Sequence, residues 1–285
     1  MNKIVIFGAG LIGGSFALAL RQAGAAREVV GFGRRAATLE EAQRLGILDR
    51  IGTDEAREVA DADLVLIATP VAKMGEILRR IAPHLGPDTL VTDGGSTKCD
   101  VVAAAHANLG SRLAQFIPAH PIAGAEHSGP AAARADLYQG RKVVLTPLPE
   151  NGAAAVARVR AAWEACGAVV SELTPEQHDA VFAAVSHLPH LLSFALVHDI
   201  AQRDNRDLLL SFAASGFRDF TRIAASSPEM WRDISLANRE ALLREVKGYA
   251  DELHVLYQAL EANDAAKLEE IFAEAQKVRA NWKQQ

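Results

Sequence analysis

The sequence predicts an α/β fold in which a doubly wound parallel sheet is followed by a second, all-helical domain. Short β-branched runs alternate with longer segments of helical spacing as far as Leu173, a pattern typical of a doubly wound sheet. A glycine-rich turn, Gly8-x-Gly10-x-x-Gly13, directly follows the first of these runs. After Thr174 no further convincing strand appears, which indicates a change of domain.

Each expected strand is a near-continuous apolar run, as strands buried on both faces of a parallel sheet usually are. The expected strands are Lys3–Phe7, Glu28–Phe32, Leu64–Thr69, Thr89–Thr92, Gln115–Ile117, Lys142–Thr146 and a last one, Ala168–Leu173. Helical spacing with few breakers is found over Leu11–Ala23, Thr38–Leu45, Val71–Leu85 and Thr97–Leu109. We therefore expect the first domain over residues 1–173, with Pro149–Gly152 as a turn inside it.

The second domain is expected over residues 174–285. Thr174-Pro175-Glu176-Gln177 has a hydroxyl cap, a first-turn proline and a glutamine three residues after the cap, which together predict a helix start. Ser227-Pro228-Glu229 predicts another. A heptad-like seam then consists of Leu242, Val246, Tyr249, Leu253, Leu256 and Leu260. This seam either faces the core of its own chain or forms part of a homodimer contact through the C-terminal helices.

Composition excludes several classes of protein. A chain of 285 residues that is 49% apolar can bury a large core, so it is neither disordered nor fibrous. A net charge of −5 gives no positive surface for nucleic acid or membranes. Cys99 and Cys166 form no C-x-x-C pair, and we find no apolar run of about 20 residues. Because a strand is expected from Lys3, leaving no room for a signal peptide, we expect a cytoplasmic protein.

The glycine-rich turn predicts a Rossmann dinucleotide site. Gly8 allows the tight turn, Gly10 lets the backbone approach a pyrophosphate, and Gly13 lets the helix pack on the strand. The N–H groups of the following residues, Leu11 and Ile12, then face the phosphates at the helix N-terminus. Thr69, at the end of an expected neighbouring strand, is assigned to the same cofactor site.

The end of the second strand indicates which nicotinamide cofactor is used. An NAD site usually places a carboxylate there to accept a hydrogen bond from the ribose 2′-hydroxyl. This chain has Gly33 at that place, followed by Arg34 and Arg35. Two guanidiniums suit a 2′-phosphate, so NADP is the preferred cofactor and NAD remains possible. The alternative is that both arginines are ordinary solvated charges.

His120 is the candidate general base. It belongs to His120-Pro121-Ile122-Ala123-Gly124, which we expect to be a loop after the strand-like run Gln115–Ile117. Loops at the carboxyl ends of parallel strands form the ligand crevice. Oxidation of an alcohol requires a base for the hydroxyl proton, and neutral histidine serves near pH 7. Taken alone, a histidine before a proline is more often structural.

Several motifs occur in an order that resembles the prephenate/arogenate dehydrogenase family of tyrosine biosynthesis, over nearly the whole chain. They are Gly8-x-Gly10-Leu11-Ile12-Gly13-Gly14-Ser15, Asp93-Gly94-Gly95-Ser96-Thr97-Lys98, His120-Pro121-Ile122-Ala123-Gly124, Ser186-His187-Leu188-Pro189-His190, Gly216-Phe217-Arg218-Asp219-Phe220-Thr221-Arg222-Ile223-Ala224 and Trp231-Arg232-Asp233. The resemblance implies a Rossmann domain, a helical dimerisation domain, and oxidative decarboxylation of prephenate or arogenate to 4-hydroxyphenylpyruvate or tyrosine.

The same resemblance implies two catalytic residues. His120 would accept the proton of the ring hydroxyl while hydride leaves the same carbon. Ser96 would hydrogen-bond that hydroxyl or His120, and alignment of this kind can lower a barrier by several kcal/mol. The alternative for Ser96 is an N-cap of the helix expected from Thr97, and the two roles are compatible.

Four further residues are implied in substrate binding: Arg222, His190, Ser186 and Glu126. Arg222 would bind a substrate carboxylate, and its alternative is a salt bridge with Asp219 three residues earlier. His187 and His190 could instead pack at the proline break, while metal ligation lacks a third ligand, so no metal is expected.

Two positions depart from the pattern of the resembling family. Gly33 replaces the acid of relatives that use NAD, and Ala125 stands where some relatives have threonine. Two rival functions remain. One is another two-domain dehydrogenase, such as a β-hydroxyacid dehydrogenase or an imine reductase, which would not need His120 and Arg222 together. The other is a non-catalytic NADP-binding sensor.

Overall fold

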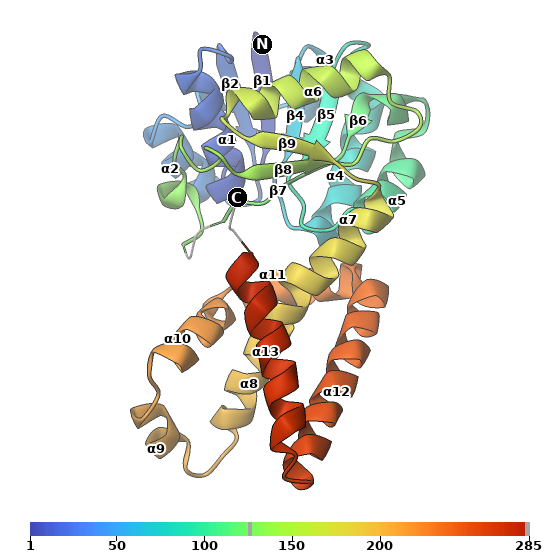
Figure 1. Ribbon diagram of the computed structural model, residues 1–285. Helices are drawn as coiled ribbons and strands as arrows, with labels where there is room; N and C mark the ends of the chain where they lie inside the picture. Colours follow the sequence, from blue (N-terminus) through green and yellow to red (C-terminus); the bar gives the residue numbers. More distant parts are fainter. Residues whose placement is uncertain (125–126, 283–285) are drawn as a thin grey trace. The chain divides into compact units, whose positions relative to one another are not determined.

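The computed structural model describes residues 1–124 and 127–282 (Figure 1). The chain divides into two compact units, Met1–Arg239 and Glu240–Gln285. The first unit contains both sheets and the helices that follow them as far as α11 (Pro228–Ala237). Everything that forms the candidate site described below lies within this first unit.

The main sheet has six strands, all parallel, in the order β3-β2-β1-β4-β5-β6. These strands are β1 (Lys3–Phe7), β2 (Glu28–Phe32), β3 (Arg50–Ile51), β4 (Leu64–Ile67), β5 (Leu90–Asp93) and β6 (Phe116–Ile117). The chain runs outward from β1 to β3 and then returns to place β4 on the other side of β1. Ligands of such sheets bind at this reversal, at the carboxyl ends of the strands. The predicted Rossmann fold class is confirmed.

The helices connecting these strands cover both faces of the sheet. They are α1 (Leu11–Gln22), α2 (Ala36–Arg44), α3 (Glu55–Ala60), α4 (Met74–Ile81) and α5 (Cys99–Leu109), with short 3-10 turns η1 (Val71–Lys73), η2 (Ala82–His84) and η3 (Gly110–Gln115). Ile4 and Ile6 of β1 belong to one buried cluster, while Val5 and Phe7 belong to the other. Strand β1 is therefore buried on both faces, as its continuous apolar run predicts.

A second, three-stranded sheet follows the first. It contains β7 (Ala119–Pro121), β8 (Lys142–Leu145) and β9 (Val169–Glu172), with η4 (Pro130–Ala132) before β8 and α6 (Ala153–Ala165) before β9. Strand β7 is antiparallel to β8, and β8 is parallel to β9. The expectation that Lys142–Thr146 joins the parallel sheet is therefore wrong, because an apolar run indicates a buried strand but not its partner. His120 is also not in a loop, since it is the central residue of β7.

A long helix begins the helical part of the first unit. It comprises α7 (Pro175–Phe182), a π-helical turn η5 (Ala183–His187) and α8 (Leu188–Ala201). Thr174 caps it by accepting from Gln177 N, and the Gln177 side chain bonds back to Thr174, so the predicted capping box is confirmed. Pro189 lacks the N–H that would bond to Val185, and its ring crowds that carbonyl, which accounts for the wide turn before it.

Contrary to expectation, this helix is long and apolar enough to cross a membrane by length and composition alone. Its most apolar window has a mean hydropathy of 1.7, and 28% of that window is buried. However, its buried side chains include His178, Asp179 and His187, each with polar partners elsewhere in the first unit. These contacts make it a helix of a folded domain, in which apolar side chains such as Leu192, Phe194 and Leu196 are half-buried.

The remaining helices of the first unit are α9 (Arg206–Ser211), α10 (Ser215–Thr221), the 3-10 turn η6 (Arg222–Ala225) and α11. Helix α11 begins at the predicted cap, where Ser227 accepts from Met230 N. No strand occurs among the described residues after Glu172, as predicted.

The second unit consists of α12 (Arg239–Glu261, which starts one residue before the unit) and α13 (Ala265–Asn281). Asp264 caps α13 by accepting from Lys267 N. Of the predicted seam, Leu242 is buried, whereas Leu253 and Leu260 are 49% and 63% exposed. A core-facing role therefore fits the start of the seam only, and its later residues are available for another contact.

Candidate active site

The glycine-rich turn adopts the geometry that its sequence predicts. Gly8 has φ +99°, a left-handed conformation, and its N–H donates to Phe32 O at 2.8 Å. A Cβ on Gly8 would lie 2.5 Å from Ala68 O, and one on Gly13 would overlap Gly8 O. By contrast, a Cβ on Gly10 would meet nothing within 4 Å. The main chain is thus tightly packed at Gly8 and Gly13, with open space at Gly10, the N-cap of α1.

These residues fit an anionic dinucleotide. Leu11 and Ile12 form the first turn of α1, whose N–H groups have no side-chain cap from Gly10. Thr69 follows β4, and its methyl group lies near Gly8. The Thr69 hydroxyl is buried and has no hydrogen-bond partner among the described residues. Such a buried hydroxyl beside the turn is suited to a polar ligand atom.

Arg34 and Arg35 lie directly after β2 and are exposed. Arg35 is the N-cap residue of α2, and Gly33 before it is also exposed. The bond from Gly8 N to Phe32 O joins this strand end to the glycine-rich turn. The two arginines therefore lie near the glycine-rich turn in space. Because both are exposed, packing in the core does not explain their presence.

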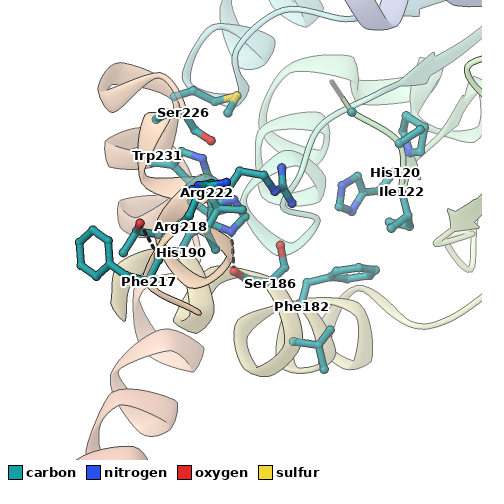
Figure 2. Close-up of a pocket in the computed structure, with 18 of the residues that line it drawn as sticks. His120, Ile122, Phe182, Ser186, His190, Phe217, Arg218, Arg222, Ser226 and Trp231 are labelled. Atoms are coloured by element: carbon teal, nitrogen blue, oxygen red, sulfur yellow. Dashed lines mark hydrogen bonds between the residues drawn. The ribbon is translucent and has the colours of Figure 1, made fainter. Parts of the chain in front are cut away.

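One pocket in the first unit gathers residues that are far apart in the sequence (Figure 2). Its volume is about 1060 Å³. Among its lining residues are His120 from β7, Ser186 from η5, His190 from α8 and Arg222 from η6. Figure 2 shows the Arg222 side chain directed toward the side of the pocket where the His120 ring lies. Four of the six predicted catalytic and substrate-binding residues thus line one cavity.

The other two predicted residues are placed differently. Ser96 lies between β5 and α5 and does not belong to the described lining of the pocket. It is not an N-cap either, because α5 begins at Cys99 and the N–H groups of Lys98 and Cys99 donate to the Asp179 carboxylate at 2.8 and 2.9 Å. Glu126, like Ala125, lies outside the described residues.

His120 has a neutral, partly buried imidazole. Burial lowers the pKa of His120 well below its usual value, and the charges of His178, Lys98 and His187 lower it further. Its ring packs edge-on against Phe182 at 4.9 Å between centroids. An unprotonated imidazole that faces a cavity at neutral pH can accept a proton from a ligand.

A buried ion pair fixes the strand that carries His120. Lys98 and Asp93 are both fully buried and bonded to each other. Ala119 N donates to Asp93 Oδ1 at 2.9 Å, and Lys98 Nζ donates to Ala119 O at 2.8 Å. Both backbone groups of the residue before His120 are thus held by one charged pair. The motif Asp93–Lys98 was noted in the sequence, but this role was not predicted.

His190 and Trp231 form another side of the pocket. Their rings stack with centroids 3.6 Å apart at 19°. His190 Nδ1 lies 2.9 Å from Ser186 O, so it donates there and leaves Nε2 as an acceptor. Burial lowers the pKa of His190, with Arg222 acting in the same direction and the Ser186 bond opposing it. The stacking role of Trp231 was not predicted, although its motif was quoted.

His187 has a structural environment. It is buried, Asn238 Nδ2 lies 3.1 Å from its Nδ1, and it also bonds to the Ser96 backbone. Burial lowers the pKa of His187 to about 4. No group of three or more potential metal ligands is found in the described part of the chain. The packing interpretation therefore accounts for His187.

Sequence reasoning also missed Arg218, His178 and Asp179. Arg218 lines the pocket one helical turn before Arg222. His178 and Asp179 contact His120 and the start of α5 respectively. His178 and Asp179 are adjacent in the first turns of α7, but no pattern in the sequence places them beside His120.

Comparison with known proteins gives concordant matches over nearly the whole chain. Residues 16–172 match the nucleotide-binding domain of prephenate dehydrogenase, and residues 174–274 match the prephenate dehydrogenase dimerization domain. The cyclohexadienyl dehydrogenase of Zymomonas mobilis is 36% identical over 280 residues, covering 98% of this chain and 95% of that protein. The prephenate dehydrogenase of Bacillus subtilis is 37% identical, covering 98% of this chain and 75% of that protein.

Solved structures agree. The A. aeolicus prephenate dehydrogenase in complex with hydroxyphenyl propionate and NAD+ has a TM-score of 0.91 and 36% identity, with 98% of each chain covered. The Synechocystis arogenate dehydrogenase has a TM-score of 0.81 and 30% identity, covering 98% of this chain and 99% of that one. A putative ketopantoate reductase from Ralstonia solanacearum, with a TM-score of 0.55 and 16% identity, shares the fold alone.

Proposed function

The chain belongs to the prephenate dehydrogenase family, and from this premise we propose that it oxidatively decarboxylates a cyclohexadienyl substrate in tyrosine biosynthesis. The observation that carries the proposal is that His120 and Arg222 face one cavity. A base for a hydroxyl and a guanidinium for a carboxylate are the two groups that such a substrate requires.

His120 is the proposed base. Its neutral imidazole accepts the proton of the ring hydroxyl as the carbon that bears this hydroxyl gives up hydride. The oxidised nicotinamide, when bound, supplies the hydride acceptor. The ring carboxylate then leaves as carbon dioxide, because its electron pair completes an aromatic ring. Ser96 is proposed to assist through the same hydroxyl, although it does not belong to the described lining of the pocket.

Arg222 is the proposed carboxylate ligand. The substrate is a dianion and the chain carries a net charge of −5, so a fixed guanidinium is needed to attract and hold it. His190, with Nε2 free to accept, and Ser186 complete the proposed substrate contacts. Glu126 stays a candidate from sequence.

We propose NADP as the preferred cofactor, with NAD possible. The support is the exposed pair Arg34 and Arg35 after β2, together with Gly33 at the position of the usual carboxylate. The choice between prephenate and arogenate is proposed to depend on the side-chain end of the substrate, where the two differ by a keto or an amino group. Reduction of each cofactor with each substrate, in four assays, separates these possibilities.

We also propose that the protein works as a cytoplasmic homodimer through its C-terminal helices. Residues 174–274 match a dimerization domain, and apolar side chains there are exposed in the single chain. They include Leu208, Phe212, Leu253 and Leu260. Sedimentation equilibrium that gives a monomer at micromolar concentration would contradict this assembly.

The test of the proposed reaction is His120→Asn. We expect kcat to fall by about 10²–10⁴, the usual contribution of a general base, because asparagine keeps a polar side chain but accepts no proton at neutral pH. NADP affinity, measured separately by fluorescence titration, should not change. Turnover near that of the wild type would exclude His120 as the base. Cofactor binding with no turnover of either substrate by the wild type would favour an NADP-binding sensor.

A further inference from the structure

His120 is the first member of a chain of three side chains. Its Nδ1 lies 2.8 Å from His178 Nε2, and His178 Nδ1 lies 2.8 Å from Asp179 Oδ1. His178 is fully buried and Asp179 is 4% exposed. Phe182, one helical turn after His178, packs against both imidazoles at centroid distances of 4.9 and 4.5 Å. Phe182 therefore shields one side of the contact between the two imidazoles from solvent.

Asp179 is held as a carboxylate. Burial alone would raise the pKa of Asp179, but hydrogen bonds from His178 and from the N–H groups of Cys99 and Lys98 outweigh burial and lower it. These two N–H groups belong to the start of α5, where an anion is stabilised by the helix dipole. The position of Asp179 is thus fixed by the backbone of Cys99, which lies 80 residues earlier in the sequence.

The carboxylate determines which nitrogen of each imidazole carries hydrogen. An ionised carboxylate only accepts hydrogen bonds, so His178 must carry its proton on Nδ1. In a neutral ring, His178 Nε2 is then an acceptor, and the 2.8 Å contact requires a proton on His120 Nδ1. His120 Nε2 is left as an unprotonated lone pair, the atom that a general base needs.

We propose that His178 and Asp179 are positioning residues, which select the protonated nitrogen of His120 and thereby make its Nε2 the base of the reaction. This inference rests on the proposed function. It concerns two buried side chains that do not themselves contact the pocket, and it follows from the order of donors and acceptors along the chain.

The same arrangement can take up the positive charge that the reaction creates. When the substrate proton reaches His120 Nε2, the proton on His120 Nδ1 can move to His178 Nε2. His120 becomes neutral again, and the single positive charge then resides on the ring bonded to Asp179. Burial and the charge of Lys98 lower the pKa of both rings, but the hydrogen bond to Asp179 and the charges of Asp179 and Asp93 act in the opposite direction on His178.

The first experiment identifies the protonated nitrogen in the wild-type protein. ¹⁵N NMR of histidine-labelled enzyme distinguishes Nδ1–H from Nε2–H rings, and the His120→Asn spectrum identifies the signals of His120. We expect His120 to be protonated on Nδ1 at neutral pH. A His120 ring protonated on Nε2 would overturn the proposal, whatever any variant does.

The second experiment reverses the chain with Asp179→Asn. With the amide nitrogen at the place of Oδ1, its NH₂ can donate to His178 Nδ1. The amide oxygen at the place of Oδ2 keeps the bond from Cys99 N, while Lys98 N loses its acceptor. His178 would then carry its proton on Nε2 and donate to His120 Nδ1, which leaves His120 protonated on the wrong nitrogen. Such a reversal at a catalytic histidine can cost about 10⁴ in kcat. We expect a loss of at least 10² in kcat, unchanged NADP affinity and a switched ¹⁵N signal.

Two histidine variants separate positioning from mere stability. His178→Gln supplies an amide oxygen that can accept from His120 Nδ1, so the correct tautomer persists and we expect only about a tenfold loss of kcat. His178→Phe fills the same space with no acceptor, and its kcat should fall much further at a similar melting temperature. If kcat fell equally in both variants and each fall were matched by a lower melting temperature, the contact would be only structural.

A control variant is His106→Gln, on the exposed side of α5, for which kcat should not change. Full activity in Asp179→Asn with an unswitched signal would refute the positioning role. It would leave the proposed reaction standing if His120→Asn were inactive, so the two failures can be distinguished. The pH profile of kcat/KM adds a further readout, because Asp179→Asn removes the negative charge that is bonded to His178 while Lys98, Asp93 and His187 remain.

Discussion

The dinucleotide turn and the substrate pocket differ in what they present to a ligand. The turn offers main-chain groups from one short segment, Gly8–Gly13, and its shape depends on the absence of side chains. The pocket offers side chains from β7, the helix from Pro175 to Ala201, η6 and α11. Local sequence is therefore sufficient to predict the first site, whereas the second can be recognised only when distant elements have packed together.

The largest effect on stability and cofactor binding is expected at Gly13, where the main chain of α1 approaches that of Gly8. In Gly13→Val, the new side chain would overlap Gly8 O and approach Ile6, so α1 must move away from β1. Overpacking of this kind costs about 1–3 kcal/mol or more. We expect cofactor binding to be lost and the melting temperature to fall, as measured by fluorescence titration and calorimetry.

Gly10→Ala is the matched control for that variant. A Cβ on Gly10 would meet nothing within 4 Å, so the fold should keep its melting temperature. Cofactor affinity should nevertheless fall, because the methyl group occupies the space through which a pyrophosphate approaches the backbone. Unchanged affinity in Gly10→Ala would show that the phosphates bind elsewhere.

An intermediate effect is expected in the pocket, from Arg222→Gln. Hydrogen bonds to charged groups contribute about 1.5–3 kcal/mol, so KM should rise by about 10–150-fold. The melting temperature and the cofactor affinity should change little, since Arg222 is exposed. A loss of stability with an unchanged KM would favour the alternative, in which Arg222 mainly pairs with Asp219.

The smallest effect is expected from the double variant Arg34→Ala and Arg35→Ala. Both side chains are exposed, so solvent and salt weaken any contact with a 2′-phosphate. We expect NADP affinity to fall by about tenfold while NAD affinity is retained. Equal weakening of both cofactors would mean that these arginines do not distinguish them.

The same contrast explains what sequence could predict. The strands and helices that were predicted in the first domain, the glycine-rich turn and the caps at Thr174 and Ser227 depend on local pattern, and the structure confirms them. The elements β3, β7, α3 and α6 were not predicted. The second sheet could not be predicted, because an apolar run such as Lys142–Leu145 does not specify its partner.

Within the site, the candidates found from sequence were those that belong to recognisable motifs. The contribution of His178 and Asp179 could not be inferred, since it depends on packing of α7 against β7 and the start of α5. For Ser96, local pattern was misleading. Its position before an expected helix suggested an N-cap as the alternative to a catalytic role, but the N–H groups at the start of α5 donate to Asp179 instead.

The π-helical turn at Ala183–His187 has a consequence for the whole of the long helix. One additional residue in a turn changes the rotational phase of everything after it by about 100°, the angle per residue of an α-helix. Because of this additional residue, His178 of α7 faces His120 while His190 of α8 lines the pocket, although both belong to one continuous helix. An insertion or deletion of one residue between Asp179 and His190 would put these two sets of side chains out of phase with each other.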